Sequence, residues 1–401
     1  MLPSVSLCRT AAASLLFFTA CTTPAFSQTL TSFHTFVGTD GCSPTSGLIR
    51  GKDGNFYGIT SGGGGDAGEG TVFKITPAGK FTSIYAFAGG TADGAFPFAS
   101  PIRDAAGNLY GTTSNGGPSN AGIVWKVTPS GRESILHAFS GHSDGGYSDS
   151  DLIRDAKGNL YGTTFGGGDN SCSTYLNGCG TVFKVNATRM ETVIHSFEGG
   201  TDGEYPYAGL VMDSAGNLYG ATAYQDGLNF IGGGQVFKID PSGNKTVVYA
   251  FELGSPNGDT PSNDLTFAPG HVLYGTTSEG GDLNVCSGAG CGTIFKIDAS
   301  GVLTTLHTFE GTPSDASAPD GPIARDSAGN LYGTSYTGGP NNLGSVFKLD
   351  TSGNVTLLHS FTGGSDGFSP SGRLYVSGDG TVYGTARQGD NGCGLAFKIT
   401  P

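Results

Sequence analysis

The chain has 401 residues and a formal charge of −13, with 20 Lys and Arg against 33 Asp and Glu. Affinity for nucleic acid comes largely from basic residues that neutralise phosphates, so this composition argues against a nucleic-acid partner. Gly contributes 71 residues, and Thr, Val, Tyr and Phe are abundant without any long helical periodicity. This combination favours an all-β fold of short strands and tight turns.

The N-terminus has the features of a cleaved export signal. Arg9 precedes an apolar run at residues 11–20, which is too short to span a bilayer but suits the central region of a signal peptide. Small side chains just before Gln28 fit a cleavage site, so we expect a signal peptide at 1–27 and one mature domain at 28–401. Cleavage before Cys21 is the alternative and would leave a lipid-anchored protein. Both predict a secreted, extracellular or periplasmic protein without a transmembrane span.

From about residue 29 onward the sequence repeats one phrase. A Gly-Asn-Leu-Tyr-Gly-type turn and strand is followed by a Gly-rich loop, a Val-Phe-Lys strand and a strand that ends in Phe. The tyrosine of this phrase occurs seven times, at Tyr57, Tyr110, Tyr161, Tyr219, Tyr274, Tyr332 and Tyr383. The spacing of 51 to 58 residues indicates a tandem array of one supersecondary unit within a single domain.

Each copy is long enough for four strands. In the first copy we expect them at residues 47–50, 56–58, 71–75 and 81–87, with Asp-Gly-Asn and Pro-Ala-Gly turns joining the first to the second and the third to the fourth. The strands are nearly continuous apolar runs, which is typical of sheets buried on both faces by neighbouring sheets. Seven four-stranded antiparallel units of this kind predict a seven-bladed β-propeller.

The two ends of the chain carry complementary fragments of one copy. Residues 32–36 match a fourth strand but have no first three strands before them, whereas residues 373–398 supply a first, second and third strand without a fourth. We therefore expect the N-terminal strand to complete the C-terminal blade and close the ring, which leaves no exposed sheet edge at the ends.

The cysteines of the mature domain number six, and parity favours three disulfides in an oxidising compartment. Cys42 follows the N-terminal strand and Cys393 precedes the last strand, in loop types that emerge on the same face of a four-stranded meander. We therefore predict a bridge between them across the closure of the ring. Two further bridges are predicted within single loops: Cys172 with Cys179, and Cys286 with Cys291.

The repeated phrases are similar to those of a known family. The stretches Gly-Asn-Leu-Tyr-Gly-Thr-Thr at 107–113 and Gly-Thr-Val-Phe-Lys at 180–184 resemble the GloVer tandem repeat of exported "choice-of-anchor" proteins, and the resemblance covers the mature chain. It implies an exported protein with a surface anchor and no assigned biochemical activity. The sequence shows no sorting tail after its last Val-Phe-Lys-like strand, so anchoring would depend on Cys21.

Histidine and lysine recur at fixed positions of the repeat. Five of the seven histidines share one position in the fourth strand, and a catalytic residue would not recur in most copies, so we assign them a structural role. His142 lies outside this position, in a loop with Asp144, and is a candidate functional group. A lysine ends the third strand of every copy, and we expect it to pair with the hairpin acid of the same blade, as Lys74 would with Asp53.

The loops from each fourth strand to the next first strand repeat an Asp-Gly pair in most copies, at Asp40, Asp93, Asp144, Asp202, Asp320 and Asp366. An Asp in such a turn commonly caps its own backbone. Calcium is the alternative, but it takes about six to eight oxygen ligands, and one Asp per loop is too few to favour it. The sequence predicts no other cofactor or metal.

Three consecutive copies of this loop also carry aromatic side chains. Flat rings beside carboxyl or amide groups are typical of sugar-binding surfaces, because the ring stacks on C–H faces while the polar groups bind hydroxyls. The alternative is that these rings fill the seams between blades. The candidate ligand-binding residues are Phe96, Phe98, Tyr147, Tyr205 and Tyr207, together with Asp93, Asp144, Asp202 and His142.

These features favour a monomeric, exported binding or scaffold protein that recognises a polysaccharide or a protein through its loop face. The sequence contains no Gly-x-Ser-x-Gly elbow and no phosphate-binding loop. The alternative is a carbohydrate-active enzyme, a hydrolase or lyase using Asp residues at the channel mouth, because such carboxylate pairs leave no sequence spacing. Carboxylates converging from different blades would favour the enzyme, and an aromatic shelf alone would favour binding.

Overall fold

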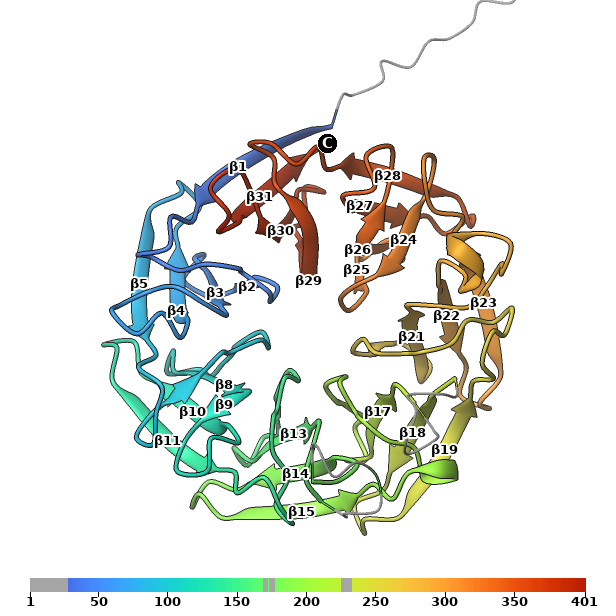
Figure 1. Ribbon diagram of the computed structural model, residues 1–401. Helices are drawn as coiled ribbons and strands as arrows, with labels where there is room; N and C mark the ends of the chain where they lie inside the picture. The colour runs from blue at the N-terminus through green and yellow to red at the C-terminus, as the bar shows by residue number, and fades with distance from the viewer. Residues whose placement is uncertain (1–27, 169–171, 173–176, 225–232) are drawn as a thin grey trace, which may run out of the picture.

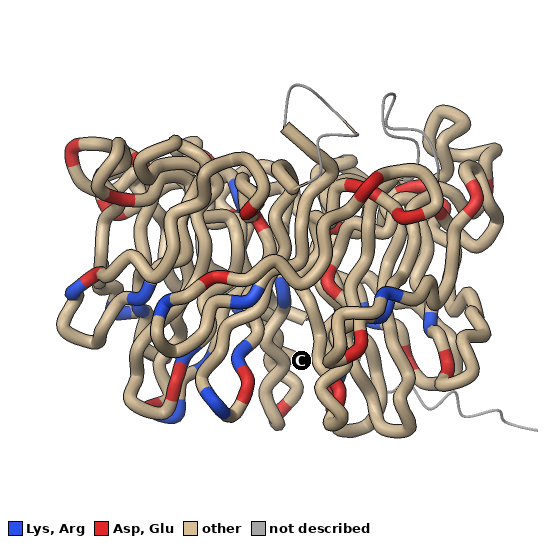
Figure 2. The backbone as a smooth tube through the Cα atoms, turned by 90° about the horizontal axis from the view of Figure 1, so that it is seen from below, with Lys and Arg blue, Asp and Glu red and all other residues tan. Residues whose placement is uncertain are grey.

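The computed structural model describes residues 28–168, 172, 177–224 and 233–401. In these residues seven antiparallel sheets stand as blades around one axis, each with its strands in order from the centre to the rim (Figure 1). Seen from the side, the ring is a disc with loops on both faces (Figure 2). The predicted seven-bladed β-propeller is confirmed.

The blades are numbered 1 to 7 along the chain, and each has four main strands. The inner strands are β2 (Ile49–Arg50), β7 (Ile102–Arg103), β12 (Ile153–Arg154), β16 (Val211–Met212), β20 (Thr266–Ala268), β25 (Ala324–Arg325) and β29 (Phe368–Val376). The second strands are β3 (Phe56–Thr60), β8 (Leu109–Thr113), β13 (Leu160–Thr164), β17 (Leu218–Thr222), β21 (Val272–Thr277), β26 (Leu331–Gly338) and β30 (Val382–Gln388).

The outer half of each blade is equally regular. The third strands are β4 (Thr71–Ile75), β10 (Ile123–Val127), β14 (Thr181–Val185), β18 (Gln235–Ile239), β22 (Thr293–Ile297), β27 (Ser345–Leu349) and β31 (Leu395–Thr400). The fourth strands of blades 1 to 6 are β5 (Phe81–Ala86), β11 (Glu133–Ala138), β15 (Glu191–Ser196), β19 (Lys245–Ala250), β23 (Leu303–Thr308) and β28 (Val355–Ser360). Short additions are β6 (Gly94–Ala95), β9 (Asn115–Gly116), β24 (Ala316–Pro319) and the 3₁₀ turns η1 (Gly200–Asp202) and η2 (Cys286–Gly288).

The ring is closed by its own ends. The fourth strand of blade 7 is β1 (Thr29–Thr35), which lies antiparallel to β31 and pairs Thr29 with Thr400. Figure 1 shows this N-terminal strand lying along the C-terminal blade. The Cys42–Cys393 disulfide joins the same two segments. Both the complementary ends and the bridge across them are confirmed.

The other two disulfides form as predicted, Cys172 with Cys179 and Cys286 with Cys291. Three disulfides are typical of a protein that folds in an oxidising compartment. No helix within the described ranges is long and apolar enough to cross a membrane. The predicted signal peptide at 1–27, with Cys21, lies outside the described residues.

Aromatic packing holds neighbouring blades together at all seven seams. The Phe that ends each fourth strand is buried and packs on the third-strand ring of the next blade, with ring centroids 5.1 to 5.7 Å apart. The glycine after each repeated Tyr makes room for the third-strand ring of its own blade. A Cβ on Gly275, for example, would lie 2.5 Å from Cζ of Phe295. The Tyr-Gly pair of the repeat therefore reflects a close approach of a ring to the backbone.

The hairpin between the first and second strands explains the rest of the repeated phrase. In blade 2, Asp104 accepts hydrogen bonds from the side chain of Asn108 at 2.8 Å and from the hydroxyl of Tyr110 at 2.9 Å. Lys126 lies over the Tyr110 ring, 5.6 Å from its centroid, and three further blades repeat this cation–π contact. Among the described residues no ion pair joins a repeat lysine to its hairpin acid, so the predicted pairing is wrong. The acid is held by donors of its own hairpin and, for Asp53, also by Arg103 at 3.2 Å.

Candidate functional site

Seven loops, each leading from the rim of one blade to the inner strand of the next, converge on the ring axis at one face. In each loop one residue adopts a positive φ between 49° and 58°: Ser43, Phe96, Tyr147, Tyr205, Thr260, Ala318 and Ser369. Such a backbone is strained for a residue other than Gly and persists only where surrounding contacts enforce it. The recurrence of this turn makes it a built feature, and the residues that follow it lie at the centre.

The start of each loop is anchored to the outer strand that precedes it. In five blades a histidine Nε2 lies 2.8 to 3.2 Å from an aspartate oxygen, in the pairs His34–Asp40, His137–Asp144, His195–Asp202, His307–Asp315 and His359–Asp366. Tyr85 donates to Asp93 at 2.8 Å and Asn257 donates to Tyr249 at 3.2 Å in the other two. The recurrent histidines thus have the structural position that the sequence predicted.

Four predicted ligand-binding residues belong to this rim region. Asp93, Asp144 and Asp202 use their carboxylates in the anchors, where they also accept backbone N–H groups. His142 is exposed in the turn that begins one of these loops. In the sixth copy the anchor is Asp315, and Asp320, which the sequence grouped with the other Asp-Gly turns, lies at the ring centre instead. The rim residues are therefore not brought together at one site.

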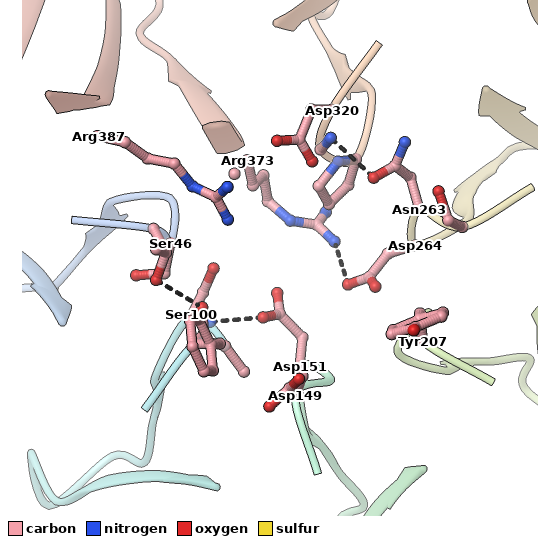
Figure 3. Close-up of a pocket in the computed structure, with 17 residues that line it drawn as sticks. Ser46, Ser100, Asp149, Asp151, Tyr207, Asn263, Asp264, Asp320, Arg373 and Arg387 are labelled. Carbon is pink, nitrogen blue, oxygen red and sulfur yellow. Dashed lines mark hydrogen bonds and ion pairs between the residues drawn. The ribbon is translucent and has the colours of Figure 1, made fainter. Parts of the chain in front are cut away.

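A cavity of about 330 Å³ lies at the ring axis where the loops converge, and its wall is formed by the loops that lead to blades 1 to 6 and by strands β29 and β30 of blade 7. Figure 3 shows polar side chains pointing into it from different blades. Asp149 and Asp151 come from the loop before blade 3, Asp264 from that before blade 5, and Arg373 from blade 7. We take this central pocket as the candidate functional site.

Two carboxyl groups and a guanidinium meet across the pocket. Asp151 accepts the backbone N–H of Ser100 at 2.6 Å, and Asp264 accepts that of Gly209 at 2.5 Å. Arg373 lies 3.6 Å from Asp264, and Asp151 lines the same pocket close enough for the two acids to act on each other's ionisation. Burial and the charge of Asp264 raise the pKa of Asp151, and burial raises that of Asp264. Two neighbouring buried carboxyl groups hold one proton between them more readily than two negative charges.

Other polar groups complete the wall. Burial raises the pKa of Asp149 to about 7, and burial also raises that of Asp320, against the nearby charge of Arg387. Asn263 is held in one orientation, since its oxygen accepts the N–H of Gly321 at 2.8 Å and its nitrogen donates to Pro319 at 2.9 Å. The pocket therefore offers both donors and acceptors in fixed positions.

The five predicted aromatic residues divide among three environments. Phe98 and Tyr207 line the central pocket. Tyr205 is 2 % exposed, and its ring centroid lies 4.8 Å from that of Phe165, which also packs at a tilt against Tyr207 with centroids 4.1 Å apart. Phe96, 40 % exposed, and the half-buried Tyr147 lie at the turn of their loops, outside the pocket wall. Of the predicted aromatics, Phe98 and Tyr207 have the position that a ligand at the axis would reach.

Metal ligation has little support among the described residues. The one group of three candidate ligands found there is Cys172, Cys179 and Glu204, and both cysteines are joined in a disulfide. Calcium at the Asp-Gly turns stays a prediction, although each rim carboxylate already serves an anchor.

Sequence reasoning missed most of the charged pocket residues, namely Asp149, Asp151, Asp264, Arg373 and Arg387. Except for Arg387, they fall a few residues after the repeated Asp or Asn, at positions where the copies differ from one another. Alignment of the seven copies would have shown this departure from the repeat. The convergence itself could not be seen, because it depends on closure of the ring.

Comparison with known proteins gives the family and the fold. The sequence matches the Gloeobacter/Verrucomicrobia repeat over residues 20–176, 173–287 and 285–401. No curated protein matches it. Among solved structures, a streptogramin B lyase is similar with a TM-score of 0.60 at 13 % identity, covering 93 % of this chain and 97 % of that one.

Two further structures have the same architecture. Virginiamycin B lyase from Staphylococcus aureus is similar with a TM-score of 0.60 at 14 % identity, covering 93 % of this chain and 99 % of that one. The extracellular domain of a "putative hybrid two component system" from B. thetaiotaomicron is similar with a TM-score of 0.55 at 14 % identity, covering 93 % of this chain and 41 % of that one. At such identities the likeness shows the propeller fold alone.

Proposed function

We propose that this chain, which belongs to the Gloeobacter/Verrucomicrobia repeat family, is an exported binding module that holds a carbohydrate in the central pocket. The observation that carries this proposal is the composition of the pocket wall, where Phe98 and Tyr207 lie among carboxyl, amide and guanidinium groups. Sugars present C–H faces to aromatic rings and hydroxyls to polar groups, so one wall of this kind serves both.

The fixed orientation of the polar groups supports recognition. Asn263, Asp151 and Asp264 are each held by backbone N–H groups of neighbouring loops. A ligand therefore meets groups that have already lost their rotational freedom, which reduces the entropic cost of binding. This favours a specific small ligand over a broad, adaptable contact surface.

The pocket volume limits what can enter. A cavity of about 330 Å³ is at the lower end of the range for small-molecule sites. It suits one or two sugar units or the end of a polysaccharide chain better than a chain that runs across the face. A protein partner, the other ligand class predicted from the sequence, would have to present a single side chain here.

The test is a glycan array with the mature domain, followed by calorimetric titration of each sugar that binds. Tyr207→Ala and Phe98→Ala should weaken the affinity about 3- to 10-fold each, because a stacked ring contributes about 0.5 to 1.5 kcal/mol. Phe96→Ala is the matched control, since this exposed ring lies outside the pocket wall. Equal affinities for all three variants and the parent would contradict the proposed site.

A second candidate function rests on the carboxyl pair. Asp151 and Asp264 come from different blades and share the pocket with Arg373, an arrangement that could move a proton in a hydrolase or lyase reaction. We prefer binding because both carboxyl groups are already engaged, Asp151 by the N–H of Ser100 and Asp264 by the N–H of Gly209 and by Arg373. Chromatography of sugars incubated with the protein decides between the two, since bond cleavage that Asp151→Asn abolishes would establish the enzyme.

A further inference from the structure

We propose that the carbohydrate held in the pocket carries a protonated amine, which binds at Asp149 between the rings of Phe98 and Tyr207. This inference rests on the proposed function and specifies its ligand class as an amino sugar with a free ammonium group. The argument uses the order of the blades, the missing partner of one carboxyl oxygen and the distribution of charge around the pocket.

The three side chains occupy equivalent positions in consecutive loops. Phe98, Asp149 and Tyr207 each follow the repeated Asp by five residues, in the loops that lead to blades 2, 3 and 4. All three line the pocket. Asp149 therefore has an aromatic residue on either side around the ring, while Figure 3 shows it beside Asp151 on the same loop. An ammonium ion bound by this carboxylate would have an aromatic residue of the pocket wall in the loop on either side, which favours charge and cation–π attraction.

One oxygen of Asp149 lacks a partner. Its Oδ1 is buried and forms no hydrogen bond with any described residue. Only the Ser114 side chain stabilises the ionised form of this carboxyl group, whereas the other pocket carboxylates have backbone donors or a guanidinium nearby. A buried carboxylate is costly unless a donor or a cation compensates it. An ammonium group would supply both a hydrogen-bond donor and a positive charge at this position.

The two basic residues of the pocket wall both come from blade 7. Arg373 pairs with Asp264 and also acts on Asp151, and Arg387 acts on Asp320, whereas neither acts on Asp149. Among the described residues, no Lys or Arg of blades 2, 3 or 4 lines the pocket. The half of the wall that contains Asp149 is thus negative and aromatic, which favours a cationic group over a neutral one.

The rings are held ready for this contact. Tyr207 packs against Phe165 with ring centroids 4.1 Å apart and an interplanar angle of 32°. Burial and the neighbouring Tyr224 and Asp149 raise the pKa of Tyr207, so its hydroxyl keeps its proton. The ring therefore stays neutral and electron-rich, as an ammonium contact requires.

Protonation of Asp149 should make the affinity for an amino sugar depend on pH. Because burial raises the pKa of Asp149 to about 7, an ammonium ligand must displace a proton below that pH. The affinity for an amino sugar should then fall as the pH drops from about 7 to 5, by up to tenfold per unit. A neutral sugar that accepts a hydrogen bond from the protonated acid would show the opposite trend.

The experiment titrates the mature domain at pH 7 with glucosamine, galactosamine and mannosamine, with their parent hexoses and N-acetyl derivatives as matched neutral ligands. At least one hexosamine should bind about 10-fold more tightly than both neutral counterparts, as expected for a desolvated charge pair. Asp149→Asn should bring this ratio close to one. Asp66→Asn, which removes one negative charge from an exposed loop position, should keep the ratio of the parent protein.

The outcomes separate the two proposals. Equal affinity for amino and neutral sugars would overturn the ammonium site and leave the carbohydrate function standing. Binding of ethylammonium in a manner that needs Asp149, with no sugar binding, would overturn the carbohydrate function and keep the ammonium site. Absence of binding by every probe would overturn both. If Asp149→Asn fails to fold, the pH profile of the parent protein decides, since affinity that rises toward pH 5 contradicts the ammonium.

Discussion

The two ends of each converging loop differ sharply in how far the seven copies agree. At the rim, a His–Asp, Tyr–Asp or Tyr–Asn contact recurs in every blade, and the buried Phe beside it packs on the next blade. At the centre, equivalent positions hold residues as different as Thr45, Phe98, Asp149, Tyr207 and Ser371. Rim residues of every blade pack against equivalent residues of the next blade, whereas the central residues of all blades line one shared pocket.

This difference separates structural residues from candidate functional ones. A residue that packs between blades is constrained by identical surroundings, so the copies keep it. A residue at the axis contributes to a single pocket, where identical side chains would give a sevenfold ring with no specific shape. We therefore expect substitutions at the rim and seams to change stability, and substitutions at the centre to change binding.

The largest expected effect is on ring closure. Replacing Cys42 and Cys393 by Ser should lower the free energy of unfolding by up to about 5 to 6 kcal/mol on the loop-entropy estimate, because this bridge closes a loop of 351 residues. The matched double variant of Cys286 and Cys291, whose separation is 5 residues, should cost about 2 kcal/mol. Urea unfolding measures both, and equal losses would contradict closure by the termini.

The next effect contrasts a seam ring with a pocket ring. Phe237→Ala should cost about 3 to 5 kcal/mol, because this fully buried ring packs on Phe197 of the preceding blade at 5.3 Å. Phe98→Ala, at the pocket wall, should cost less than about 1 kcal/mol. Thermal unfolding of the two variants is the measurement, and a Phe98 variant as unstable as the Phe237 variant would remove the distinction between seam and pocket.

A pH effect reports on the buried acids of both regions. Burial raises to about 7 the pKa values of Asp149 and Asp151 in the pocket and of Glu133 and Glu191 near the seams. The folded state then binds more protons than the unfolded state between about pH 4 and 7. Stability should therefore fall as the pH rises through this window, by at most about 1.4 kcal/mol per unit for each proton lost.

Urea midpoints at pH 5 and pH 8 measure this trend. The double variant Asp149→Asn, Asp151→Asn should show a smaller difference between the two pH values, because two of the groups that lose protons are gone. An unchanged difference would show that the pocket carboxyls titrate normally.

The smallest effect compares two rim anchors. Asp202 accepts hydrogen bonds from His195 and from Lys245, both at 3.0 Å, and the Lys245 side chain is 7 % exposed. Burial opposes ionisation of Asp202, but these bonds outweigh it and lower its pKa to about 2. Asp202→Asn should cost about 2 kcal/mol, because it leaves a buried ammonium without its charge partner.

The matched variant at the rim is Asp366→Asn. Asp366 pairs with His359 at 2.9 Å, but no lysine pairs with it. We expect a loss of about 1 kcal/mol, the contribution of a typical hydrogen bond. Chemical unfolding compares the two variants, and an equal loss would mean that Lys245 does not depend on Asp202.

Much of the fold could be predicted because the repeat presents each local rule seven times. The Tyr-Gly pair, the turn residues and the terminal Phe gave the strand order, and the incomplete copies at the ends gave the closure that Thr29 and Thr400 now show. The lysines were assigned the wrong partner. The repeat predicts that Asp53 and Lys74 lie at the same end of the blade, but it does not reveal that the Tyr57 hydroxyl donates a hydrogen bond to Asp53 at 2.6 Å.

The sequence by itself determined the number of blades, the closure of the ring and the disulfides, since these follow from periodic burial and from cysteine positions within a repeated unit. Only the tertiary structure decided where the site lies. Asp151, Asp264 and Arg373 are far apart along the chain and approach one another only when seven loops meet at an axis. A repeat fixes what each blade looks like, but the chemistry at the centre depends on contacts between blades that no single copy contains.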